Sequence, residues 1–326
     1  MRAEVAAAAK GRGANTEAHR LYLQGRYLVD RLNQEDVQQG IQYLRQALDL
    51  DPGHALAWVQ LSHAFYFQAG FDWAPVVEGY TRAREAAGRA VALEPDLAEA
   101  YAALGQVQIA FDWDWKGAEA SYRRALELAP GSAEVLRGAS TPPLQFGRHA
   151  EAVDLARRAV EQDPLSATGY VMLGRTYRAT GALDKAHEAF RKALELAPQR
   201  IMTHFWLAIT HQALGRDEEA LAEAKLERAP WARACALGIV CHAAGRKAEA
   251  DAALRELVEM GADTAAYQIA AVYAARAQRD EMFEWLERSY AQRDPGLAQM
   301  ICEPVFRPHH GDPRWRAFAR KMKFEG

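Results

Sequence analysis

The chain has 326 residues, of which 50% are hydrophobic and 25% charged, the composition of a soluble folded protein. With 40 basic and 43 acidic residues, its net charge of -3 creates no overall field that favours nucleic acid or an anionic membrane. Three cysteines without a C-x-x-C motif argue against a disulfide framework or a structural zinc site. The early apolar run VAAAA at residues 5–9 is too short for a signal-peptide core or a membrane span. We therefore expect a cytoplasmic protein with neither nucleic acid nor a membrane as its partner.

Small residues and prolines recur along the chain with a period of 34 residues. One alanine series with this spacing is Ala118, Ala152, Ala186 and Ala220, and the matching proline series is Pro130, Pro164 and Pro198. A fixed period of this length is typical of proteins built from stacked helical repeats.

The clearest unit is YVMLGRTYRATGALDKAHEAFRKALELAP at residues 170–198. Its apolar residues lie three and four apart, which predicts one buried face on each of two helices. Gly174 and Ala186 are small where the two helices must approach closely, and Phe190 fills the gap between them. Pro198 ends the second helix and turns the chain into the next unit.

The order and spacing of these residues resemble the tetratricopeptide repeat, a pair of antiparallel helices, and weaker copies tile most of the chain. We predict an all-α fold: a right-handed superhelical solenoid of about eight such repeats, with a C-terminal capping helix. The expected division is a flexible segment at 1–17, an array at 18–294 and a cap at 295–326. The predicted repeats span 18–53, 55–96, 98–131, 133–165, 167–199, 201–230, 231–262 and 263–294.

Two FDW stretches, at residues 71–73 and 111–113, interrupt this regularity. Alternation of aromatic and acidic residues in FDWDW could indicate a strand or a ligand site. Gly105 to Ala118 nevertheless takes one residue more than Gly174 to Ala186, so the stretch falls at a turn between paired helices. We predict that Asp114 caps the following helix while the tryptophans pack over the joint. A ligand surface at the FDW segments stays an alternative.

Proline marks two further places. Pro142-Pro143 falls inside the first helix of the fourth repeat and should break or kink it. Asp312-Pro313 predicts the start of a last helix, which buries Trp315 and Phe318 and covers the end of the array. A basic docking surface is the alternative for this helix, and His309-His310 before it is expected to be exposed.

A wider resemblance covers residues 16–324. The stretches YLQGRYLVDRLNQEDVQQG, FDWDWKGAEASYRRALELAP, FEWLERSYAQRDPG and DPRWRAF appear in that order. Together they resemble the tetratricopeptide region that follows bacterial winged-helix regulators, adenylate-cyclase-type domains and Ser/Thr kinases. The resemblance implies a regulatory region that binds a protein partner. No P-loop, kinase motif or nucleophile–base constellation is present, so we expect no enzyme activity, catalytic residue or cofactor.

In such arrays the first helices of the repeats line a groove. Arg137, Arg175 and Arg178 are predicted to lie there, where guanidinium groups would bind an acidic peptide by bidentate pairing. The other predicted groove residues are Arg26, His63, Tyr66, Gln106, Phe205 and Gln212. Alternatively, the arginines pair with Glu134 or other acids of the array.

Three further alternatives remain open. His204 and His211, two helical turns apart, could bind a metal, but packing between helices is the expected role, so no metal site is predicted. The array could chiefly serve self-association of a larger effector protein. A small-molecule or hydrolytic site near the FDW segments and Pro142-Pro143 is the third.

Overall fold

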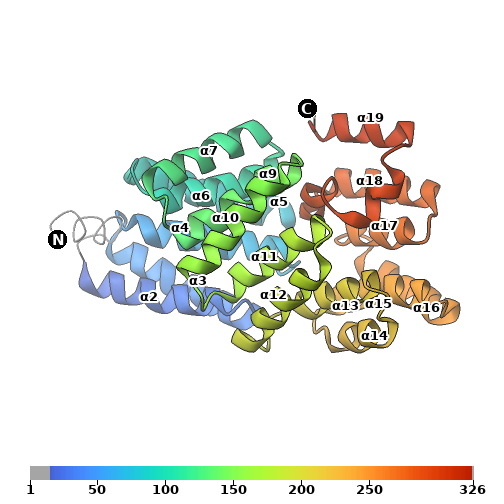
Figure 1. Cartoon of the computed structure of the whole chain (residues 1–326). Coiled ribbons are helices and arrows are strands. Elements are labelled where there is room, and N and C mark those ends of the chain that lie inside the picture. The colour runs from blue at the N-terminus through green and yellow to red at the C-terminus, as the bar shows by residue number, and fades with distance from the viewer. Residues whose placement is uncertain (1–14, 325–326) are drawn as a thin grey trace. The chain divides into compact units, whose positions relative to one another are not determined.

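The computed structural model describes residues 15–324 and, over that range, contains helices and turns but no strand. The chain divides into two compact units, unit 1 ending at Ala139 and unit 2 beginning at Ser140. Figure 1 shows both units as packed helices. Among the described residues, no helix has both the length and the apolar character needed to cross a bilayer.

Unit 1 is built from successive antiparallel helix pairs. Its elements are α2 (Thr16–Asp30), α3 (Gln34–Leu50), α4 (Ala55–Gly70), α5 (Val76–Leu93), α6 (Ala98–Val107), the π-helix η1 (Gln108–Asp112), α7 (Trp115–Leu128) and α8 (Ala133–Ala139). The first helices of the pairs, α2, α4, α6 and α8, contact one another in succession. We call the side chains that they share the first-helix surface of unit 1.

Unit 2 repeats this construction and adds a C-terminal extension. Its elements are α9 (Thr141–Gln145), α10 (His149–Gln162), α11 (Ala167–Ala179), α12 (Leu183–Leu196), α13 (Thr203–Ala213), α14 (Asp217–Leu226), α15 (Pro230–Ala243), α16 (Lys247–Gly261), α17 (Ala266–Ala275), α18 (Arg279–Gln292), the 3₁₀ helices η2 (Pro295–Gln299) and η3 (Pro304–His309), and α19 (Pro313–Lys321). Here α11, α13, α15 and α17 form the first-helix surface.

The flexible segment predicted at residues 1–17 lies outside the described residues except for its last three. Asn15 is the N-cap of α2, and its side chain accepts hydrogen bonds from the backbone N–H groups of Glu17 and Ala18. A capped helix therefore begins at Thr16, two residues before the predicted start of the first repeat.

Close approach within a helix pair depends on a small residue opposite a large ring. A Cβ atom on Gly174 would lie 2.6 Å from the ring of Phe190, which is fully buried. Gly105 faces Tyr122 in the same way, at 2.9 Å. Because dense packing leaves no room for an added methyl group, both glycines are required by space. The predicted pairing of Gly174 with Phe190 is confirmed.

The FDWDW stretch is a turn with a cap, as predicted, and a π-helix takes up its extra residue. η1 follows α6 directly, and the N–H of Asp114 donates to the carbonyl of Gln108 at 3.0 Å. The Asp114 side chain then caps α7 by accepting from the N–H of Gly117, also at 3.0 Å. Trp113 and Trp115 are both 4% exposed. A single residue inserted into a helix commonly widens one turn in this way.

The prolines of the fourth repeat break its first helix, as predicted. α8 ends at Ala139, and α9 begins at Thr141 with Pro142 and Pro143 in its first turn. Proline is tolerated there because the first N–H groups of a helix have no intrahelical acceptor. The division between units 1 and 2 falls at this break.

Two buried carboxylates, which sequence analysis missed, cap helices that lack a local cap. Glu227 accepts hydrogen bonds from the N–H groups of Met202 and Phe205 at the start of α13, both at 3.1 Å, and from Ala229 at 3.0 Å. Asp294 does the same for Tyr267 at the start of α17, at 2.9 Å, and Gly296, at 2.8 Å. Each carboxylate comes from the end of the second helix of the pair and satisfies donors of the first.

The last helix begins where Asp312-Pro313 predicted it. Asp312 caps α19 by accepting from the N–H of Arg314 at 2.9 Å. The buried Phe318 packs edge-on against Tyr290 of α18, and Arg314 pairs with Asp280 of the same helix at 2.7 Å.

The expectation that His309-His310 is exposed is wrong. His309 is 2% exposed, and its Nε2 lies 3.0 Å from the carbonyl oxygen of Ala274 on α17. His310 stacks on Trp315 with their ring centroids 4.4 Å apart. The chain after α18 is thus packed against the repeats through side chains that sequence analysis assigned to a loop.

Candidate functional site

The first-helix surface of unit 2 holds a stretch of the same chain, residues 295–309, which we call the C-terminal segment. Arg175 Nη2 donates to the side-chain oxygen of Gln299 at 2.6 Å. Arg178, three residues further along α11, forms a salt bridge with Glu303. The two arginines therefore bind successive polar side chains of one passing segment.

We call the side chains of unit 2 that contact the C-terminal segment its seat. A third polar contact also lies on α11. Arg307 donates from Nη2 to the backbone oxygen of Ala179, the last residue of the helix. The carbonyl groups of the last helical turn have no intrahelical donor, so a guanidinium group is a favourable partner there. Gln299, Glu303 and Arg307 are spaced four apart and contact α11 in the order in which they occur.

Aromatic and apolar contacts complete the seat. The guanidinium groups of Arg175 and Arg178 lie 4.9 and 5.2 Å from the ring centroid of Trp206 on α13, within the range of cation–π attraction. Phe306 is fully buried, with its ring centroid 5.6 Å from that of Tyr267 on α17. A Cβ atom on Gly296 would collide with Tyr267, so the segment passes directly over that ring.

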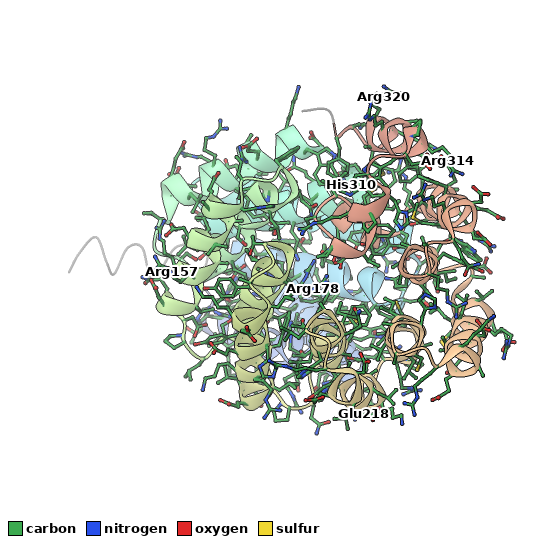
Figure 2. The ribbon with its side chains drawn as sticks, turned by 45° about the vertical axis from the view of Figure 1, so that its right-hand side comes forward. Arg157, Arg178, Glu218, His310, Arg314 and Arg320 are labelled. Atoms are coloured by element: carbon green, nitrogen blue, oxygen red, sulfur yellow. The ribbon has the colours of Figure 1, made fainter. Side chains whose placement is uncertain are left out.

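Glu303 lies close to several helices of this surface. Its salt bridge is to α11, and after burial its charge is the second cause that raises the pKa of Cys235 on α15 and of Tyr267 on α17. Arg178 is only 7% exposed and Glu303 is 12% exposed, so the charged pair is largely removed from water. In Figure 2, Arg178 is labelled near the middle of the view, below His310, whereas Arg157, Glu218 and Arg320 lie at its edges.

The prediction that Arg175 and Arg178 share one face of a first helix agrees with these contacts, but their partner was not foreseen. Sequence analysis considered acids of the array such as Glu134, whereas the acid that pairs with Arg178 follows the array. One signal could have found it, since Glu303 is the single acid between Asp294 and Asp312.

Other predicted residues of unit 2 have different positions. Phe205, which was predicted to line the groove, is 7% exposed, and its ring packs edge-on against Trp206 with centroids 4.9 Å apart. Gln212 is partly buried near the end of α13. The physical reason is that α13 is apolar on most of its circumference, so helical spacing alone does not identify its outward side.

The first-helix surface of unit 1 combines charges of both signs with aromatic rings. Its predicted residues come from α2, α4, α6 and α8 in turn, namely Arg26, His63, Tyr66, Gln106 and Arg137. Arg26 Nε lies 3.7 Å from Asp30 Oδ2, and both side chains are at least half exposed. His63 Nε2 lies 3.6 Å from Glu134 Oε1.

Burial, followed by the positive charge of Arg137, lowers the pKa of His63 to about 4. His63 is therefore neutral at pH 7, and it bonds as a polar ring rather than as a cation. Glu134, named above as a possible arginine partner, faces this histidine. The surface is thus a mixed polar one rather than a purely basic patch.

His204 and His211 each face a neighbouring helix. His204 Nδ1 lies 2.6 Å from Glu223 Oε2 on α14, and the ring of His211 packs edge-on against His187 of α12, with centroids 4.9 Å apart. Residues 15–324 contain no group of three or more histidine, cysteine or acidic side chains that could hold a metal ion. Contact between helices is the role that these distances describe.

The comparisons with known proteins agree with this construction. Residues 113–167, 143–201 and 171–233 match the family model described as tetratricopeptide repeat. Residues 113–233 of this chain therefore contain tetratricopeptide repeats. The matched residues run from the FDWDW turn in unit 1 to the start of α15 in unit 2, and therefore include the arginines of α11.

Two curated proteins are similar to parts of this chain. The Small glutamine-rich tetratricopeptide repeat-containing protein 2 of Mycosarcoma maydis is 28% identical over 109 residues, which are 33% of this chain and 31% of that protein. The Cellulose synthase operon protein C of Pseudomonas fluorescens is 32% identical over 162 residues, 46% of this chain and 12% of that one. The chain spans less than a third of the length of these curated relatives.

A solved structure of a human IFIT1 dimer with PPP-AAAA superposes with a TM-score of 0.57. The match covers 79% of this chain and 69% of that one at 16% sequence identity, which shows a shared fold and nothing further. Stacked helix pairs are therefore the architecture of the described residues, and those within 113–233 match the tetratricopeptide repeat, a scaffold consistent with protein–protein interaction.

Proposed function

We propose that this protein is a non-enzymatic scaffold that binds a peptide segment of a partner protein on the first-helix surface of unit 1. The observation that carries the proposal is the seat of residues 295–309 in unit 2, where the equivalent set of helices already holds a polypeptide. Helices stacked in this way offer side chains from several repeats to one passing chain.

The composition of the unit 1 surface supports a peptide as its ligand. Arg26 and Asp30 are exposed ion-pair partners that can exchange for charges of a partner. Tyr66 and Gln106 are partly buried, so they add apolar contact area together with hydrogen-bonding groups. A mixed surface of this kind suits a polar segment better than a uniformly charged polymer.

The proposed setting is the regulatory region of a bacterial signalling or transcription-regulating protein. Its support is the resemblance, over residues 16–324, to tetratricopeptide regions that follow bacterial effector modules. A cytoplasmic location is part of the same proposal.

Photocrosslinking tests the proposed surface. A photoreactive amino acid replaces Gln106 on the first-helix surface of unit 1 or, as the matched control, the exposed Arg123 on α7, a second helix. We expect a discrete protein adduct from position 106, lost when Arg26 and Arg137 are changed to alanine, and none from position 123. Equal adducts from both positions, or adducts that persist in the double variant, contradict the proposal.

The same experiment separates the polymer classes. The IFIT1 structure was solved with PPP-AAAA, and a crosslink at position 106 that disappears after ribonuclease treatment would assign RNA rather than peptide to this surface. We expect the adduct to survive ribonuclease and to disappear with protease.

Self-association is the second candidate, and α2 favours it. Leu23 and Tyr27 lie one helical turn apart and are 49% and 66% exposed. Two such apolar side chains on the first helix of the unit are suited to contact with another copy. Sedimentation over a wide concentration range tests this: association that is weakened by Tyr27→Lys supports it, and a monomer at every concentration excludes it.

A further inference from the structure

The carboxylate seat in unit 2 offers more hydrogen-bond donors than Glu303 uses. Glu303 engages Nη2 of Arg178, while Arg178 Nε is buried and has no hydrogen-bond partner among the described residues. The hydroxyl of Tyr267, whose pKa is raised by burial and then by the charge of Glu303, is likewise buried without one. Buried donors without acceptors are rare because leaving them unpaired is costly.

The surroundings of these donors favour an anion of planar shape. The guanidinium carbon of Arg178 lies 5.2 Å from the ring centroid of Trp206, so the ring limits how the guanidinium group can turn. A carboxylate facing both Nε and Nη2 would form the bidentate pair that arginine prefers, whereas the present pair uses one nitrogen. The resident glutamate is thus a monodentate occupant of a site with bidentate capacity.

The resident segment has the features of a bound peptide. It meets α11 through Gln299, Glu303 and Arg307, and it buries Phe306 against Tyr267 three residues after the carboxylate. It joins α18 through Arg293, which has a left-handed backbone with φ of 55°. Its anchors are therefore one carboxylate and one aromatic ring at fixed spacing.

We propose that the C-terminal segment is an internal ligand, and that an acidic partner segment with a glutamate and an aromatic residue three positions later displaces it from Arg178, Trp206 and Tyr267. This rests on the proposed function, that helix surfaces of this protein bind peptides, and it names the chemistry of a partner for unit 2. In the resting protein, Glu303 neutralises Arg178 and keeps the seat closed. A partner carboxylate that reaches both nitrogens replaces it.

Cys302 provides a direct measure of displacement, because it is the residue next to Glu303. Cys302 is 8% exposed, and burial raises the pKa of its thiol to about 11, so the thiol reacts slowly while the segment is in place. In the full chain carrying Cys235→Ala and Cys241→Ala it is the one remaining cysteine. The rate of maleimide labelling then reports release of the segment.

The test compares this chain with its Glu303→Gln variant. We expect labelling to be about tenfold to a hundredfold faster in the variant, the effect of losing one charge-assisted hydrogen bond. The matched control is Glu287→Gln on α18, which removes the exposed partner of Lys321 on α19 and should leave the rate unchanged. Should Glu303→Gln fail to fold by circular dichroism, Arg307→Ala loosens the same segment without leaving Arg178 unpaired.

Binding in trans completes the test. The probe is a synthetic peptide of residues 295–309 with serine in place of Cys302, followed by fluorescence anisotropy. We expect it to bind the Glu303→Gln chain at least about tenfold more tightly than the chain with Glu303, and to lose about tenfold in affinity when its own glutamate becomes glutamine.

Two results overturn the proposal: equal labelling rates with no binding of the probe, or equal affinity of the glutamate and glutamine probes. Neither outcome affects the photocrosslink at position 106, which tests peptide binding in unit 1 separately.

Discussion

The turns between paired helices are built differently in the two units. In unit 2 the residue that turns the chain with positive φ is usually glycine, at Gly147, Gly181, Gly215 and Gly245, with φ between 71° and 82°. In unit 1 the corresponding residues are Leu32, Asp72 and Trp113, with φ between 51° and 61°. Side chains at such positions are strained, and only surrounding contacts hold them there.

The two units are therefore stabilised by different features. Unit 2 has glycine at most of these turns, with Ala277 as an exception, and it also has buried carboxylate caps and a segment that covers part of its first-helix surface. Unit 1 accepts strained turns, and it compensates with aromatic packing such as that of Trp113 and Trp115 around the π-helix. The first-helix surface of unit 2 is covered in part by the C-terminal segment, whereas that of unit 1 carries polar side chains of both charges.

The largest expected effect concerns the buried cap of unit 2. Glu227→Ala removes the acceptor for three backbone N–H groups and should lower the free energy of unfolding by about 3–5 kcal/mol. Hydrogen exchange should show lost protection in α13 and α15. The exposed Glu218 on α14 is the control, and its change to alanine should cost less than about 1 kcal/mol. If both variants lowered the free energy of unfolding equally, the buried cap would not be a special source of stability in unit 2.

A pH effect should distinguish unit 1. Burial is the main cause that lowers the pKa of both His54 and His63 to about 4, below about 6.5 in the unfolded chain. The unfolded state then binds more protons between these values, so this stability is complete above pH 6.5 and is lost as pH falls toward 4. The loss is at most about 1.4 kcal/mol per pH unit for each histidine.

His54→Asn separates titration from capping. His54 Nδ1 accepts from the N–H of Ala57 at 3.2 Å, and asparagine also serves as an N-cap but does not titrate. Urea unfolding between pH 7 and pH 5 should therefore show a smaller loss of stability in the variant. An unchanged pH dependence would show that His54 contributes nothing to it.

The turn glycines give a smaller effect of predictable sign. Gly181→Ala places a side chain at φ 82° and should cost about 1 kcal/mol, although no atom crowds the position. Ala277, at φ 56° in the last helix pair, is the reciprocal case, and its change to glycine should gain up to about 1 kcal/mol. Thermal unfolding measures both variants. If their unfolding temperatures changed in the same direction, the argument from backbone strain would be contradicted.

The smallest expected effect tests helix propensity in unit 1. Gly88 lies inside α5 with no atom near the position of an added Cβ. Gly88→Ala should raise the free energy of unfolding by about 0.5–1 kcal/mol. Gly105→Ala is the contrasting variant, because its Cβ would lie 2.9 Å from Tyr122, and it should destabilise. A gain from both substitutions would show that this core is looser than the distances indicate.

Local chemistry was predictable where neighbours in the sequence supply it. Asp114 and Asp312 cap the helices that follow them, Pro142-Pro143 breaks a helix, and Gly174 makes room for Phe190. Each of these depends on residues within one helix pair. Their interactions are set by spacing along the chain, which a reader of the sequence can count.

Long-range partners were not predictable in the same way. Glu303 binds an arginine 125 positions earlier, and His309 is buried against α17 instead of being exposed. Phe205 turned inward because α13 is apolar on most of its circumference. Spacing identifies faces of a helix, but it does not say which face meets a segment from elsewhere.

The sequence by itself determined that this protein consists of paired helices, because apolar periodicity, small residues and prolines act within each repeat. Only the tertiary structure decided which first-helix surface carries the chain's own C-terminal segment. That choice depends on burial of one ion pair and one aromatic ring whose partners come together only after the repeats have stacked.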